Sequence, residues 1–114
     1  MTWRPLCRLD AFDDGGALGF PAPAGSFIGL FAVRQGHQVH AYVNSCPHIG
    51  VPLDWLPNRF LSTDGTRIIC AMHGAEFTIA EGECTAGPCL GDHLQSVPVR
   101  IDGDMVLVQD DALR

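Results

Sequence analysis

The sequence has 114 residues, which fits one folded domain and leaves little room beyond a single core. Thirteen acidic residues against seven arginines, with no lysine, give a net charge of -6, which argues against nucleic acid as a partner because phosphate contacts need clustered cations. No run approaches the roughly 18 apolar residues of a membrane helix, and the start MTWRPLCRLD lacks the features of a secretory signal. We therefore expect one soluble cytoplasmic domain over residues 1–114, with no membrane contact.

The first legible elements along the chain are β-strands. Residues 13–25, DDGGALGFPAPAG, have the composition of a connector, and glycine or proline then interrupts nearly every window that could hold three helical turns. Strand-like runs follow at 26–33, 38–44, 66–70, 75–80, 94–101 and 104–109. Turn-forming residues at 34–37, 64–65, 80–83 and 102–104 lie at the junctions. The pattern predicts an all-β fold built as an antiparallel β sandwich.

A long segment between the second and third runs does not read as a strand. Residues 45–64 contain Pro47, Pro52 and Pro57, which block strand pairing. Loops of this length are usually functional or disordered, and the apolar content of VPLDWLPNRFL favours order. We expect Trp55, Leu56 and Phe60 to pack as core or cover, with a docking patch as the alternative.

Four potential metal ligands occupy the centre of the chain. One residue separates Cys46 from His48. Cys70 and His73, separated by two residues, follow after a spacer of twenty-one residues. Five cysteines in a reducing compartment do not favour a disulfide framework, and metal ligation is then the better interpretation. A structural zinc site is one alternative, although zinc sites usually pair cysteine with cysteine and histidine with histidine.

The alternating pattern resembles the Rieske 2Fe-2S proteins, whose signature is C-x-H followed by C-x-x-H. The resemblance rests on CPHIGVPL, CAMHGAEF and the segment after them, and covers roughly residues 27–109. It implies one 2Fe-2S cluster, with Cys46 and Cys70 on one iron and His48 and His73 on the other. It also implies a small cluster-binding subdomain, made of loops at about 45–54 and 69–76 and a Gly-Pro loop at about 84–91.

By the same resemblance, the protein is a small Rieske-type ferredoxin, an electron carrier without catalytic residues of its own. Its partners would be a reductase and a terminal oxygenase or another redox protein. The alternatives are a small Rieske-like subunit of a nitrite reductase and a zinc-stabilised binding module without redox activity. Val51 and Met72 stand where high-potential relatives have disulfide cysteines, and Ala75 where they have a serine. Fewer donors to sulfur predict the low end of the roughly -150 to +300 mV Rieske range.

The remaining histidines and cysteines give weaker predictions. His37 and His40 are three residues apart, so a strand would point them to opposite faces, and we expect both to be surface or turn residues. His93 is expected to be a solvated loop residue. Three cysteines lie outside the ligand set. We expect Cys7 to be a small buried apolar residue, and Cys84 and Cys89 to be free thiols, with a labile disulfide between these two as the alternative.

Overall fold

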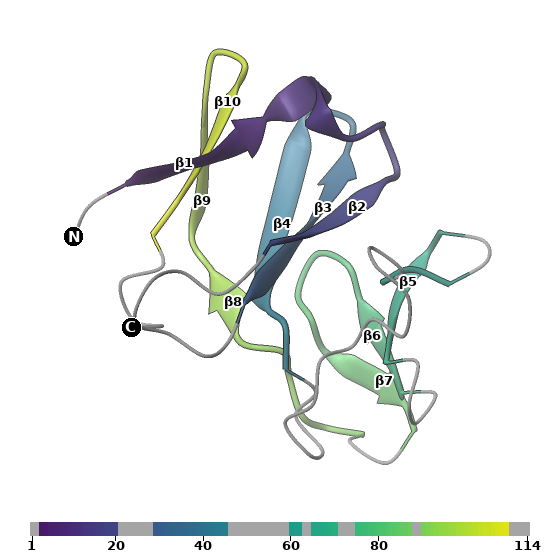
Figure 1. Ribbon diagram of the computed structural model, residues 1–114. Coiled ribbons are helices and arrows are strands. Elements are labelled where there is room, and N and C mark those ends of the chain that lie inside the picture. Colours follow the sequence, from purple (N-terminus) through teal and green to yellow (C-terminus); the bar gives the residue numbers. More distant parts are fainter. Residues whose placement is uncertain are drawn as a thin grey trace.

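The computed structural model describes residues 3–20, 29–45, 60–62, 65–70, 75–87 and 90–109 (Figure 1). The elements in these ranges are β1 (Arg4–Arg8), the 3-10 helix η1 (Leu9–Ala11), β2 (Ala17–Phe20), β3 (Leu30–Gln35), β4 (Gln38–Val43), β5 (Arg67–Cys70), β6 (Ala75–Thr78), β7 (Cys84–Ala86), β8 (Ser96–Val97), β9 (Val99–Asp102) and β10 (Met105–Val108). Within the described ranges, no helix has the length and apolar character needed to cross a membrane.

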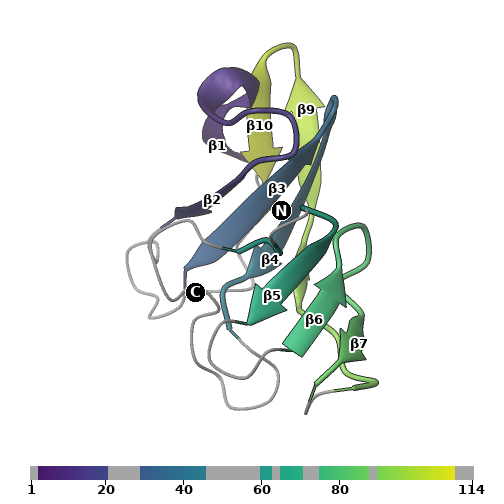
Figure 2. The same ribbon diagram turned by 90° about the vertical axis from the view of Figure 1, so that its right-hand side faces the viewer.

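The strands form three antiparallel sheets, which confirms the predicted all-β fold. Their orders are β1-β10-β9, β2-β3-β4-β8 and β5-β6-β7. Figures 1 and 2 show the sheet of β3 and β4 in the middle, with β1, β9 and β10 on one side and β5, β6 and β7 on the other. The β5-β6-β7 sheet is therefore a separate layer. The predicted ligand Cys70 is the last residue of β5, and the predicted ligand His73 lies between β5 and β6 in the sequence.

The middle sheet contributes to two apolar cores because successive side chains of a strand point to opposite faces. On β3, Phe31 and Val33 face the β5-β6-β7 sheet, whereas Ala32 faces the β1-β10-β9 sheet. On β4, Tyr42 joins the first core, and its neighbour Ala41 joins the second. Burial on both faces explains why the β3 sequence is apolar without interruption from Leu30 to Val33.

Three strands were not expected from the sequence. β2 lies inside the segment read as a connector, and its pairing with β3, in which Gly19 is opposite Phe31, overrides its weak strand propensity. β1 contains Pro5 but pairs with β10 alone, and an edge position tolerates a proline. β7 is only three residues long. In addition, the predicted strand at 94–101 is divided at Pro98 into β8 and β9.

The predicted turns are confirmed where the structure describes them. The β3-β4 and β9-β10 hairpins turn at Gly36 and Gly103, both with a φ of 62°, a left-handed conformation that favours glycine. The turn at 80–83 joins β6 to β7.

Candidate metal centre

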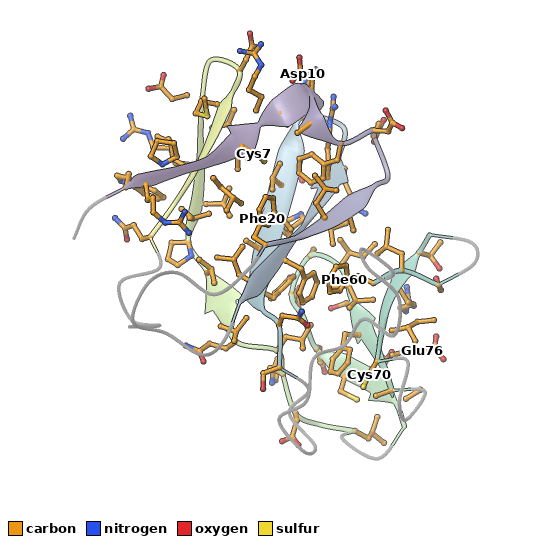
Figure 3. All side chains as sticks on the ribbon, in the orientation of Figure 1. Cys7, Asp10, Phe20, Phe60, Cys70 and Glu76 are labelled. Carbon is orange, nitrogen blue, oxygen red and sulfur yellow. The ribbon has the colours of Figure 1, made fainter. Side chains whose placement is uncertain are left out.

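Cys70 is the predicted ligand that the structure describes. It is the last residue of β5, is fully buried, and lies in the core that contains Phe60 and Phe77. Figure 3 shows it in the β5-β6-β7 part of the molecule. Its pairing partner across the sheet is Ala75, the first residue of β6. The other three predicted ligands, Cys46, His48 and His73, lie outside the described residues.

The backbone is fixed where the predicted first ligand loop begins. Val43, at the end of β4, donates its N–H to the carbonyl of Gln95 at 2.9 Å, and the next residue, Asn44, donates to Gly29 at 3.0 Å. The chain thus leaves the middle sheet from a held position, two residues before Cys46.

The described chain resumes at Phe60, alongside β5. The N–H of Ile69 donates to the carbonyl of Phe60 at 2.8 Å, and the N–H of Ser62 donates to the carbonyl of Arg67 at the same distance. Leu61 forms an antiparallel bridge with Ile68. The later part of the long segment 45–64, which follows the first predicted ligand loop at about 45–54, is therefore hydrogen-bonded to the strand that ends in Cys70.

The Gly-Pro segment approaches the second ligand loop at one point. Gly87 has a φ of 94°, and a β-carbon built on it would lie 2.7 Å from the α-carbon of Ala75. This distance is far below the usual contact of about 3.5–4.0 Å, so only glycine fits without movement. Ala75 stands two residues after His73. The contact supports the expected packing of this segment beside the site, although Pro88 and Cys89 lie outside the described residues.

The stretch of sequence that follows Cys70 is acidic. Between Arg67 and Arg100 the sequence has four carboxylates, Glu76, Glu81, Glu83 and Asp92, and no arginine or lysine. Glu76, labelled in Figure 3, is half-buried, and the other three are exposed. Exposed carboxylates attract a basic protein and speed its association, although the exposed Arg67 at the start of β5 adds a positive charge to the same sheet.

The environment of Cys70 at the end of β5 is compatible with binding to a metal cluster. Its side chain lies in an apolar core at a strand end, where a thiolate can bind iron away from water. In the described part of the chain, no three His, Cys, Asp or Glu side chains gather so as to hold a metal ion. The other expected donors belong to residues 46–59 and 71–74, outside the described part of the chain; the first of these segments is followed by Phe60, which is hydrogen-bonded to β5, and the second directly follows Cys70.

Of the other histidine predictions, the one for His40 is wrong. His40 is half-buried on β4, and its Nε2 atom is buried without a hydrogen-bond partner among the described residues. Burial lowers the pKa of its imidazole below the usual 6.5. His37 and His93 are exposed, as expected.

The structure also describes one of the three large apolar loop residues and two of the three cysteines outside the predicted ligand set. Phe60 is fully buried, which confirms a core role, whereas Trp55 and Leu56 lie outside the described residues. Cys7 is only half-buried, and that burial raises the pKa of its thiol. Cys84 is buried, with its Sγ donating to the carbonyl of Ala86 at 3.2 Å.

Sequence reasoning missed the role of Tyr42. Its buried hydroxyl donates to the carbonyl of Ile79 at 2.5 Å, and its ring fills the space beside Gly82, where a β-carbon would lie 2.8 Å from the Tyr42 Cε1 atom. Burial, with a contribution from the charge of Glu81, raises the pKa of Tyr42 to about 12. The signal for a core position was the two-residue period along β4, where Tyr42 occupies a different face from Ala41.

Comparison with known proteins identifies the family. Residues 2–101 match the Rieske [2Fe-2S] domain. The structure is similar to the ferredoxin of carbazole 1,9a-dioxygenase from Nocardioides aromaticivorans IC177, with 28% identity, coverage of 95% of this chain and 97% of that chain, and a TM-score of 0.75. It is also similar to the Sphingomonas yanoikuyae B1 ferredoxin, with 26% identity, 96% and 99% coverage, and a TM-score of 0.71.

A third similarity concerns the fold alone. The terminal oxygenase of carbazole 1,9a-dioxygenase from Nocardioides aromaticivorans IC177 is 21% identical, with a TM-score of 0.74, and the match covers 93% of this chain but 29% of that chain. A comparison with curated proteins found no match.

The family match covers most of the chain and does not favour the zinc-module alternative, because the matched domain is defined by an iron-sulfur cluster. The cofactor is one Rieske-type 2Fe-2S cluster, and similarity to two ferredoxins along nearly their whole length makes the protein an electron carrier. The chain therefore belongs to the Rieske [2Fe-2S] domain family.

Proposed function

We propose that this chain is a ferredoxin in which Cys46, His48, Cys70 and His73 hold the cluster, and that it delivers single electrons to a terminal oxygenase. The observation that carries the proposal is the position of Cys70, buried at the end of β5 and paired with the residue that follows the second loop. The proposed C-x-x-H pair therefore begins at the last residue of β5, a strand that is paired with β6.

The ligand set explains the chemistry that the cluster supplies, which is reversible uptake of one electron. Two thiolates and two neutral imidazoles leave the cluster less negative than four thiolates would, so its potential is higher than that of all-cysteine ferredoxins. Ala75 has no hydroxyl to donate to sulfur, and its packing against Gly87 is close. We keep the low end of the roughly -150 to +300 mV range as the expected potential, and a value well above zero would contradict it.

The proposed partners are a reductase as donor and a terminal oxygenase as acceptor. One similar structure, 24% identical and with a TM-score of 0.75, is described as a complex of reduced oxygenase and oxidized ferredoxin in carbazole 1,9a-dioxygenase. The carboxylates between Arg67 and Arg100 support a partner whose docking surface is basic. The entire chain, residues 1–114, is proposed to act as one domain, since both cores share the middle sheet.

A cytoplasmic location is the remaining part of the proposal. The odd number of cysteines and the unpaired thiol of Cys7 support a reducing compartment.

The ligand assignment is tested with the purified protein and four variants, each with one proposed ligand replaced by alanine. We expect a red-brown protein that contains iron and sulfide in equal amounts and becomes paramagnetic on reduction, and we expect each variant to lose the chromophore. Cys84→Ala is the matched control, because Cys84 is a buried cysteine on the same sheet and outside the ligand set. A colourless protein with stoichiometric zinc would overturn the proposal.

The proposed role in docking of the carboxylates between Arg67 and Arg100 is tested with cytochrome c, a basic one-electron acceptor. Glu83 and Asp92 lie on paired segments, since the Cys84 N–H donates to the Asp92 carbonyl at 2.8 Å. Reversing both charges to lysine should slow the reduction of cytochrome c at low salt. The same change at Asp102 and Asp104, in the β9-β10 turn region, alters the net charge equally. Equal slowing by both pairs would show that net charge alone matters.

A further inference from the structure

Phe60 belongs to a row of three buried aromatic rings, called the stack below, that joins the segment beside β5 to the middle sheet. Its ring lies on that of Phe31 of β3, with centroids 4.4 Å apart and planes 7° from parallel. Phe31 in turn contacts Tyr42 of β4, with centroids 5.7 Å apart and planes 40° apart. The exposed fractions of the three side chains are 0% for Phe31, 2% for Tyr42 and 0% for Phe60. Phe60 is labelled in Figure 3 between the middle sheet and the β5-β6-β7 sheet.

The backbone of Phe60 has a second role. Its carbonyl accepts the N–H of Ile69, and Ile69 directly precedes Cys70. The side chain is thus attached to the middle sheet, from which the first ligand segment leaves, while the main chain is attached to the strand that carries a ligand of the second pair.

The far end of the stack is also fixed. The Tyr42 hydroxyl donates to the carbonyl of Ile79, just after β6, and the Tyr42 ring packs on Gly82. The stack is therefore held to the β5-β6-β7 layer on both sides, by Phe60 beside β5 and by Tyr42 beside the β6-β7 turn. A shift of the Phe60 ring would have to break its stacked contact with Phe31.

We propose that Phe60 is a positioning residue for the cluster. Its ring on Phe31 ties it to the middle sheet, and its carbonyl holds β5 at Ile69, one residue before Cys70. Phe60 thereby fixes the position of Cys70 relative to the middle sheet. This inference rests on the proposed ligand set.

Leucine substitutions at both members of the stacked pair test the inference. Phe60→Leu and Phe31→Leu each remove the stacked ring but keep an apolar side chain. We expect both to shift the g values of the reduced cluster in electron paramagnetic resonance, to raise its midpoint potential, and to shorten the lifetime of the visible chromophore in air. The potential rises because water reaching the Cys70 sulfur stabilises the added electron.

The matched control is Phe12→Leu. Phe12 is 5% exposed and belongs to the other core, between the middle sheet and the β1-β10-β9 sheet. This variant should lose stability to urea without a change in g values or potential. The double variant of Phe60 and Phe31 should shift the potential by less than the sum of the single shifts, since both remove one contact.

The outcomes separate this inference from the ligand assignment. If the parent protein binds a Rieske cluster and Phe60→Leu keeps the parent g values and potential, the positioning role is wrong and the ligand set stands. A parent protein without the cluster refutes both. If Phe60→Leu does not fold, Phe31→Leu decides the question, because it removes the same stack from the middle sheet.

Discussion

Gly87→Ala tests whether the Gly-Pro segment holds the second ligand loop in place. The new β-carbon would lie 2.7 Å from the α-carbon of Ala75, so one of the two segments must move by about 1 Å to restore an ordinary contact. Overpacking of this kind costs about 1–3 kcal/mol. The φ of 94° adds strain for any residue with a β-carbon, on the order of 1–3 kcal/mol. The expected loss in the free energy of unfolding is therefore about 2–6 kcal/mol.

Gly91→Ala separates the two contributions. Gly91 has the same φ of 94°, but nothing lies within 4 Å of the position of its β-carbon. This variant should lose only the backbone part, about 1–3 kcal/mol. Urea unfolding followed by far-ultraviolet circular dichroism gives both losses, and the visible spectrum reports the cluster. Equal losses and equal spectra in the two variants would refute a tie between Gly87 and the residue that follows the second loop.

Three further changes have defined outcomes. Tyr42→Phe leaves the buried carbonyl of Ile79 without its donor and should lower the free energy of unfolding by about 1–3 kcal/mol; an unchanged urea midpoint would contradict the contact. Because burial lowers the pKa of His40 below 6.5, the unfolded chain takes up a proton before the folded one, so stability falls as the pH drops below that value. His40→Gln should weaken this fall between about pH 7 and about pH 5, and an identical fall in both proteins would exclude His40. Arg34→Met removes the Nη1 donor to two carbonyls of the 9–12 segment, at 3.2 and 2.8 Å, and should cost about 1–3 kcal/mol, read from the thermal midpoint.

The strand-rich fold could be predicted from the sequence because its hairpins carry local turn signals. Gly36 and Gly103 mark two of them, and the apolar runs beside them have strand composition. β2 could not be predicted in this way, because its stability comes from pairing with β3 and not from its own residues. The division at Pro98 was legible in principle, since proline lacks the N–H that a continuous ladder needs.

In the candidate site, too, features that depend on contacts between distant parts of the chain could not be predicted from the sequence. The spacing of the predicted ligands identified the family, since that signal is contained in the order of residues along the chain. The contacts of Phe31 with Tyr42 and with Phe60 were not visible, because they join residues that are eleven and twenty-nine positions apart along the chain. Nothing in QVHAYV separates a buried His40 from an exposed one until the neighbouring sheets are placed.

The position of the β1-β10-β9 sheet determines how this protein could be joined to another protein or to an electrode. β1 and β10 are paired, with Arg4 opposite Val108, and they lie on the other side of the middle sheet from β5, β6 and β7 (Figure 1). A linker joined before β1 or after β10 would therefore start on the side remote from Cys70. Fusion to a reductase, or immobilisation on an electrode through a cysteine of the β1-β10-β9 sheet, should leave the layer that contains Cys70 facing outward for exchange with a second protein.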